Sequence, residues 1–141
     1  MDTQAKLRSY YFTAVLSLVF AVIGFTYNAW RLEVSEDNNI VRTASFEVLK
    51  ELWELERIIY AAHYDEDEVE GNPRKGWIQV GLITDLSVLI SGDIERQTQQ
   101  LKRLWAAHWQ DLGRDDKKAD ELIETLHGVR QDIKQVLIEL D

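Results

Sequence analysis

The hydrophobic residues of this sequence form one long apolar run near the N-terminus and several periodic segments after it. From Ser9 to Trp30 the chain contains no charged residue. About 20 apolar residues are enough to cross a hydrocarbon core of roughly 30 Å as an α-helix. We therefore predict a single transmembrane helix at residues 10–30, preceded by a short tail at residues 1–9.

Aromatic residues bracket the apolar run at both ends. Tyr10 and Tyr11 open it, and Tyr27 and Trp30 close it. Because such amphipathic rings prefer the headgroup level of a membrane, we predict that these four side chains are interface anchors. A cleaved signal peptide is the alternative, but the run continues without a cleavage site of the A-x-A kind.

Small or polar residues recur along one side of the predicted span. They are spaced by three and four positions, at Thr13, Ser17, Ala21, Gly24 and Asn28. Such a face lets two helix backbones approach closely inside lipid. We predict a transmembrane packing face here, although similar residues also occur in spans that have no partner.

After a juxtamembrane connector at residues 31–39, apolar residues recur at steps of three and four, which is typical of amphipathic helices. The first such helix is expected over about residues 40–64, with Gly71, Asn72 and Pro73 forming a turn beyond it. Its predicted core positions are Val41, Ala44, Val48, Leu52, Leu55, Ile59 and Ala62.

The second periodic segment, over about residues 76–91, is apolar on most sides. At this length, and with Asp85 in its middle, we expect a buried core helix rather than a second membrane span. Its apolar residues are Trp77, Ile78, Val80, Leu82, Ile83, Leu86, Val88, Leu89 and Ile90.

Two further helices complete the predicted fold. The third is expected over about residues 93–112, with Gly113 as its stop signal, and the fourth from Asp115 or Asp116 to Leu140. The fourth has the heptad spacing of coiled-coil packing, and the short connections imply antiparallel neighbours.

The predicted fold class is all-α: one N-terminal transmembrane helix followed by an antiparallel up-down four-helix bundle at residues 40–141. The inward-facing positions are Ile94, Leu101, Leu104, Trp105 and His108 in the third helix, and Ala119, Leu122, Leu126, Val129, Ile133, Val136 and Leu140 in the fourth.

This architecture is similar to the sensor half of bacterial chemoreceptors and some histidine kinases. In those proteins, however, a second span and a cytoplasmic output domain follow the fourth helix, and neither is present after it in this sequence. We therefore expect that the chain does not relay a signal by itself. Likeness of architecture alone also says little about function.

Charge and composition narrow the possible partners. The chain has 16 Lys and Arg against 25 Asp and Glu, for a net charge of -9. Since phosphate backbones repel such a chain, we expect no nucleic acid partner. The absence of cysteine excludes disulfides and thiolate metal sites.

The positive charges flanking the span predict its orientation. Lys6 and Arg8 lie in the short N-terminal tail, whereas the segment after the span is rich in acidic residues. The positive-inside rule therefore favours a cytoplasmic N-terminus. In a Gram-negative cell, this would place the protein in the inner membrane with its C-terminal domain in the periplasm.

An acidic segment after the first amphipathic helix is the only candidate metal site. It runs from His63 to Glu70, and its weak candidate ligands are His63, Asp65 and Asp67. A calcium-binding EF-hand needs acids at alternating positions, a central glycine and a glutamate at about the twelfth position. Because this segment matches that pattern only in part, a solvated acidic loop is the favoured interpretation.

Two features outside this segment could also bear on function. Asp85 is a carboxylate in an apolar segment, and an internal salt bridge or a partly exposed edge is favoured over catalysis. Trp105, His108 and Trp109 share helical spacing. We assign Trp105 to the core and keep Trp109 as a possible partner contact.

The sequence contains no combination of residues that a particular chemistry requires. Phosphate-binding loops, nucleophile elbows and paired catalytic carboxylates do not stand out, so we expect no cofactor and no enzymatic activity. We expect a non-catalytic, membrane-anchored accessory or interaction protein whose partners are the lipid bilayer and either another membrane protein or a second copy. The alternative is an extracytoplasmic four-helix domain that senses a ligand or cation and acts through a partner.

Overall fold

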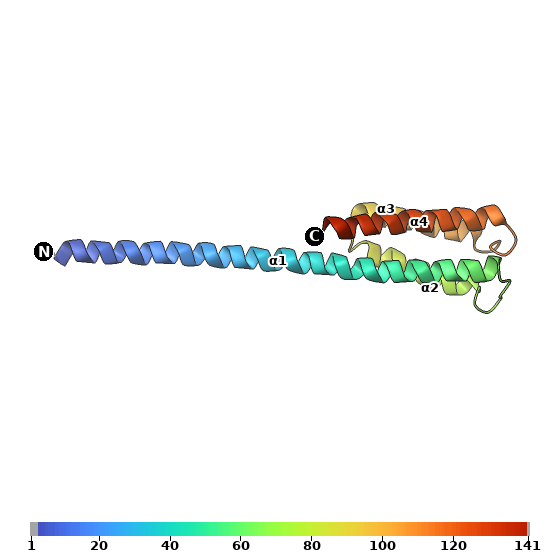
Figure 1. Ribbon diagram of the computed structural model, residues 1–141, viewed down its shortest axis with the longest axis horizontal. Helices are drawn as coiled ribbons and strands as arrows, with labels where there is room; N and C mark the ends of the chain where they lie inside the picture. The colour runs from blue at the N-terminus through green and yellow to red at the C-terminus, as the bar shows by residue number, and fades with distance from the viewer. Residues whose placement is uncertain (1–2, 141) are drawn as a thin grey trace. The chain divides into compact units, whose positions relative to one another are not determined.

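The computed structural model describes residues 3–140, and all regular secondary structure in that range is helical. It consists of α1 (Thr3–His63), α2 (Pro73–Ser87), α3 (Gly92–His108) and α4 (Asp116–Glu139), coloured along the chain in Figure 1. No strand occurs within the described range. The all-helical prediction is confirmed.

The first helix is longer than we predicted. α1 continues without a break from Thr3 to His63. The prediction of a separate helix that begins near Ile40 is therefore wrong. Residues 31–39 contain neither glycine nor proline, so nothing in them interrupts the backbone hydrogen bonds of a helix. The chain nevertheless divides into two compact units, Met1–Asn38 and Asn39–Asp141, which are described separately below.

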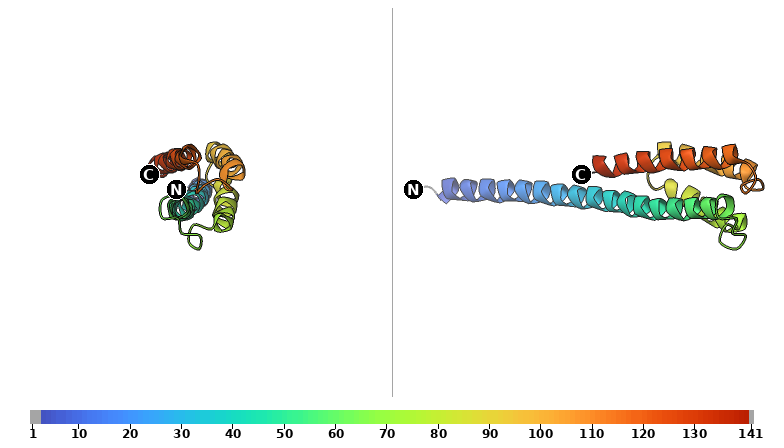
Figure 2. Two further views of the ribbon diagram at one scale, coloured as in Figure 1. Left: turned by 90° about the vertical axis from the view of Figure 1, so that its right-hand side faces the viewer. Right: turned by 45° about the vertical axis from the view of Figure 1, so that its right-hand side comes forward.

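The second unit contains the hydrophobic core. In it, α3 packs beside both α2 and α4 (Figure 2), and α4 lies alongside the C-terminal part of α1 (Figure 1). Most of the predicted core positions are confirmed, but six of them are only partly buried: Val41, Ala62, Leu104, His108, Val136 and Leu140. The buried apolar residues are Ala44, Val48, Leu52, Leu55, Ile58, Ile59, Val80, Ile83, Ile90, Ile94, Leu101, Trp105, Leu112, Ala119, Leu122, Leu126, Val129 and Ile133.

Only one face of α2 is buried, which corrects the expectation of a buried core helix. Val80 and Ile83 are fully buried, but Ile78 and Leu82 are 64% and 42% exposed. Neighbouring helices cover a single side of α2, so its second apolar side stays open to its surroundings.

Capping residues define where the shorter helices begin. The Asn72 side chain accepts a hydrogen bond from the backbone N–H of Arg74, and Pro73 occupies the first helical turn. α2 therefore begins three residues before the predicted Gly76, because Asn and Pro at these positions start a helix as well as they form a turn. Asp115 caps α4 in the same way, and α4 begins at Asp116 as predicted.

The third helix ends earlier than predicted. α3 ends at His108 rather than at Leu112, and two turns follow it. In these turns the backbone N–H of Asp111 donates to the His108 carbonyl, and the backbone N–H of Arg114 donates to the Asp111 carbonyl. Leu112 remains 1% exposed. The apolar position that suggested a longer helix is therefore buried by a loop.

Candidate interaction surfaces

The N-terminal part of α1 exposes a continuous apolar surface. Every side chain from Lys6 to Asp37 is exposed, and Phe12, Phe20 and Phe25 are 70%, 65% and 77% exposed. By length and composition, one helix in the described part of the chain could cross a membrane, and it is this one. An exposed apolar surface of this length marks a contact with lipid or with another protein.

The small residues of this part of α1 leave room for close approach. A Cβ atom added to Gly24 would meet no atom within 4 Å. The Thr13 hydroxyl donates to the Ser9 carbonyl at 2.9 Å, so this polar group has a partner inside its own helix. Ser17, Ala21 and Asn28 are exposed as well. Their role as a packing face remains a prediction.

The aromatic residues at the two ends of the apolar run are all open to the surroundings. Tyr10 and Tyr11 are 75% and 68% exposed, and Tyr27 and Trp30 are 61% and 59% exposed. The rings of Tyr27 and Trp30 lie 6.1 Å apart, centroid to centroid. These side chains are free to meet a membrane interface, as an anchoring role requires.

Two of the three candidate metal ligands, His63 and Asp67, bond to protein groups. His63 Nδ1 lies 2.8 Å from the Leu112 carbonyl oxygen, and its Nε2 lies 3.2 Å from an Asp116 carboxylate oxygen. Asp67 accepts hydrogen bonds from two backbone N–H groups of its own loop, and Asp65 is exposed. Within residues 3–140, no three His, Asp or Glu side chains are placed to hold a metal ion.

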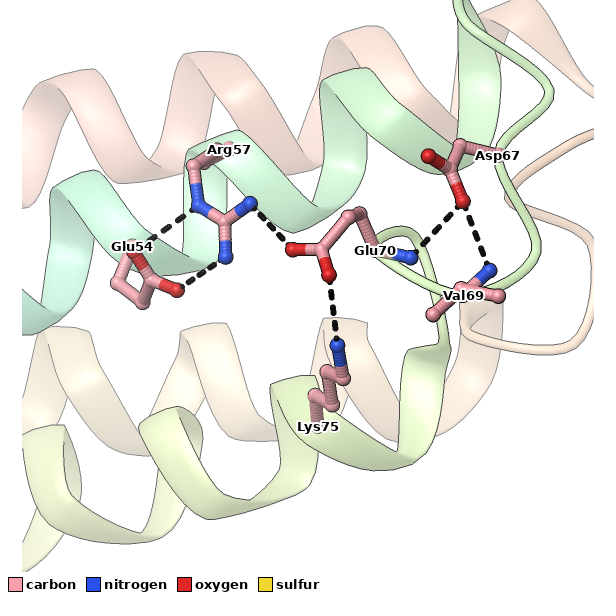
Figure 3. Close-up of polar contacts among 6 residues, drawn as sticks. All are labelled: Glu54, Arg57, Asp67, Val69, Glu70 and Lys75. Atoms are coloured by element: carbon pink, nitrogen blue, oxygen red, sulfur yellow. Dashed lines mark hydrogen bonds and ion pairs between the residues drawn. The ribbon is translucent and has the colours of Figure 1, made fainter.

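The acidic loop is instead tied to the helices by ion pairs (Figure 3). Arg57 on α1 pairs with Glu54 at 2.6 Å and with Glu70 at 2.8 Å, and Glu70 also meets Lys75 on α2 at 3.4 Å. The hydrogen bond from Arg57, followed by that from Lys75, lowers the pKa of Glu70. These contacts give the loop a structural role between α1 and α2.

A buried charge cluster, absent from the sequence-based predictions, joins α1 to α4. Glu56 and Arg130 are 4% and 5% exposed and form an ion pair, and His127 Nε2 lies 2.9 Å from the other Glu56 oxygen. Burial alone would raise the pKa of Glu56, but the hydrogen bonds with Arg130 and His127 outweigh it and leave the pKa lowered. The sequence contained one sign that Glu56 lies near the core, because this residue directly follows the predicted core position Leu55.

The outer side of α1 carries a row of exposed aromatic residues that the sequence analysis also missed. Phe46, Trp53 and Tyr60 are 58%, 58% and 40% exposed. The Arg130 guanidinium carbon lies 3.7 Å from the centroid of a Trp53 ring. The signal in the sequence was a spacing of seven residues between successive aromatic side chains.

The remaining candidate residues have structural settings. Trp105 is fully buried, as predicted, while Trp109 is partly buried against the core with its ring 6.5 Å from that of Trp77. Asp85 lies on the exposed side of α2, so its charge remains solvated. His108 Nε2 lies 2.9 Å from a Glu121 carboxylate oxygen. Trp109 as a partner contact remains a prediction.

Comparisons of this chain with protein families, curated proteins and solved structures gave no match. The surfaces described above are therefore the observations from which a function has to be inferred.

Proposed function

We propose that this chain is a non-catalytic, single-pass membrane protein whose span and helical domain dock onto another component of the same membrane or onto a second copy of the chain. The observation that carries the proposal is the uncharged stretch of α1 from Ser9 to Trp30, in which every side chain is exposed. In water, so much exposed apolar surface would be strongly unfavourable, whereas a bilayer solvates it. The positive charges of Lys6 and Arg8 support a cytoplasmic N-terminus and a periplasmic domain in an inner membrane.

The domain is proposed to be an antiparallel up-down bundle. Two contacts between α1 and α4 support an antiparallel arrangement of these helices. Glu56 on α1 contacts Arg130 on α4, whereas His63, seven residues further along α1, contacts Asp116 at the beginning of α4. Positions that ascend along α1 thus pair with positions that descend along α4. Short connections between consecutive helices are typical of the same arrangement.

The small-residue face of the span is the proposed site of association within the membrane. Replacing Ser17, Ala21 and Gly24 together with Leu fills the space that a partner backbone would occupy. We expect this triple variant to lose most of the protein that co-purifies with the tagged full-length chain in mild detergent. If the partner is a second copy, the variant should instead run as a monomer.

A matched control separates loss of packing from a general change in the span. Replacing Val15, Val19 and Val22 with Leu adds bulk on the opposite side of the same helix and should leave the association intact. Both variants remain uncharged and should stay in the membrane fraction. Unchanged association of the Ser17, Ala21 and Gly24 variant would rule out this face as the docking site.

A further inference from the structure

A hollow of about 360 Å³, here called the loop hollow, lies between α1 and the loop that follows it. It is lined by residues within 53–61 of α1 and within 65–70 of the loop, so it belongs entirely to the second unit. Sites for small molecules usually have volumes of roughly 300 to 1,000 Å³. The loop hollow is therefore large enough for a small ligand but not for a folded partner.

Two aromatic side chains of α1 line the loop hollow. Trp53 and Tyr60 are 58% and 40% exposed, so both rings are accessible to a bound molecule. The Arg130 guanidinium carbon lies 3.7 Å from the centroid of a Trp53 ring and covers one face of it. Since Arg130 is itself buried, this contact orders Trp53 in advance and removes part of the entropy loss of binding.

Most charges around the loop hollow are already paired within the protein. Arg57 lines the hollow, but its guanidinium pairs with Glu54 at 2.6 Å and with Glu70 at 2.8 Å. Glu56 pairs in turn with the buried Arg130. The hollow therefore offers no uncompensated positive charge to an anion.

The carboxylates of Asp65 and Asp67, which also line the loop hollow, are not paired in this way. Within residues 3–140, neither forms an ion pair with a basic side chain. One Asp67 oxygen accepts hydrogen bonds from the backbone N–H groups of Val69 and Glu70, and the other oxygen points away from them (Figure 3). These bonds, first that from Glu70, lower the pKa of Asp67, so its carboxylate is ionised at neutral pH.

We propose that the loop hollow binds a small organic ammonium ion. Its charged nitrogen lies beside Asp65 and Asp67, and its alkyl groups lie against the rings of Tyr60 and Trp53. Ring faces attract cations, and proteins recognise quaternary ammonium groups with aromatic side chains. The two free carboxylates supply the opposite charge. This ligand site goes beyond docking within the membrane and does not depend on it.

Other classes of ligand fit the loop hollow less well. An anion would meet two unpaired carboxylates. A metal ion needs several ligands, and no three His, Asp or Glu side chains are placed to hold one within residues 3–140. An uncharged apolar molecule would remove water from the carboxylates without replacing its hydrogen bonds. Aromatic rings beside free carboxylates thus favour an organic cation.

Binding of choline to the full-length chain in a maltoside detergent tests the site. Choline is a small quaternary ammonium ion, and the NMR signal of its methyl groups reports how much of it is bound. We expect saturable binding and displacement by tetramethylammonium. An excess of the alcohol in which carbon replaces the charged nitrogen of choline should not displace it. Displacement by this alcohol, or binding that does not saturate, would overturn the proposal.

A loop variant shows whether a particular carboxylate holds the ion or only the net negative charge attracts it. Asp65→Asn should raise the dissociation constant of choline about fivefold or more, because a short-range charge contact is lost. The matched control Glu68→Gln removes a charge from the same loop at a residue that does not line the hollow. It should change the constant less than about twofold, because salt screens distant charges. Equal weakening by both variants would contradict the proposal.

Variants of Tyr60 test the contribution of the aromatic rings. Tyr60→Leu should raise the dissociation constant about threefold to tenfold, whereas Tyr60→Phe retains the ring and should keep most of the affinity. Phe46→Leu removes an aromatic side chain of α1 that does not line the hollow, so it should change nothing. Circular dichroism confirms that each variant keeps its helices. Equal affinities of Tyr60→Leu and Tyr60→Phe would overturn the assignment of the ring.

A further arm separates the two sources of such an ion, a free solute and a lipid headgroup. Micelles of a phosphocholine detergent should displace choline if the loop hollow accepts a headgroup, and should leave it bound if the hollow accepts only a free solute. Membrane-bound protein that fails to bind choline overturns the ligand site alone. Recovery of the chain as a soluble protein that binds choline would instead overturn the proposed function.

Discussion

Replacing Arg130 with Met is expected to destabilise the helical domain by about 3 to 5 kcal/mol, the usual cost of breaking a buried ion pair. Glu56 would keep its charge in a site where it is only 4% exposed, with the neutralising guanidinium lost and only hydrogen bonds such as that with His127 left. Methionine fills a similar volume, so the loss comes mainly from the unpaired carboxylate. Urea unfolding of the full-length chain in mild detergent, followed by circular dichroism, measures the change.

Two variants identify the buried charge as the cause. Replacing Glu56 with Leu and Arg130 with Met together removes both charges and should recover most of the lost stability. Arg96→Met breaks an ion pair with Asp93 whose side chains are 76% and 77% exposed, and it should change stability by less than about 1 kcal/mol. A similar loss for Arg96→Met and Arg130→Met would contradict this explanation.

The pH dependence of the same variant follows from Glu56. Because the pKa of Glu56 is lowered in the folded state, its contribution to stability is present above the unfolded pKa and is lost as the pH falls through the folded pKa. The stability difference between Arg130→Met and the natural chain should therefore shrink in acid. A difference that does not change with pH would mean that packing, rather than charge, explains the loss.

Replacing Trp105 with Ala is expected to destabilise the domain by about 3 to 5 kcal/mol through the cavity it leaves. Trp105 is fully buried, and its ring lies against the backbone of α2 at Gly76. A Cβ atom added to Gly76 would come within 2.1 Å of the ring, so the glycine permits this close approach. Because helical backbone forms one wall of the cavity, collapse around the missing ring should be limited.

Trp109→Ala is the matched control for Trp105→Ala. Trp109 is only partly buried, so its removal should cost less than half as much in the same urea titration. An equal loss for the two variants would show that the core does not centre on Trp105. Weakened association without loss of stability in Trp109→Ala would support its predicted role as a partner contact.

The helices of the second unit could be predicted largely from the period of their apolar residues. In α4, Leu122, Leu126 and Val129 recur at steps of four and three, and all three are buried. Their period sets which side faces the core, whichever neighbour covers it. The buried face of α2 was harder to predict, because apolar residues lie on most sides of this helix. Only tertiary packing decides which of them are covered.

The buried charge cluster could not be predicted from the same patterns. Glu56 and Arg130 lie 74 positions apart, and their pairing depends on which helices are neighbours and in what register. The residues three and four positions from Glu56 are the apolar Leu52, Trp53, Ile59 and Tyr60, which places Glu56 beside the core but does not name its partner. The aromatic row, by contrast, lies on one helix, so its spacing of seven residues was visible in the sequence before the fold was known.

Two helix boundaries were missed although their signals were present. Asn72 and Pro73 form a cap and a first helical residue, a pair that was interpreted as a turn because both residues favour turns as well. The continuity of α1 was indicated by the absence of glycine and proline at residues 31–39. Residues 31–39 were predicted to be a connector, but their three acidic residues, Glu33, Glu36 and Asp37, do not end a helix.

Fractionation of the full-length chain tests most directly whether the uncharged stretch of α1 crosses a bilayer. Membranes from cells that make the protein would be washed with high salt and then with alkaline carbonate, which release proteins held only at the surface. The account predicts that the intact chain stays in the pellet and is released only by detergent. Recovery of the chain in the soluble fraction without detergent, with residues 10–30 still attached, would contradict it.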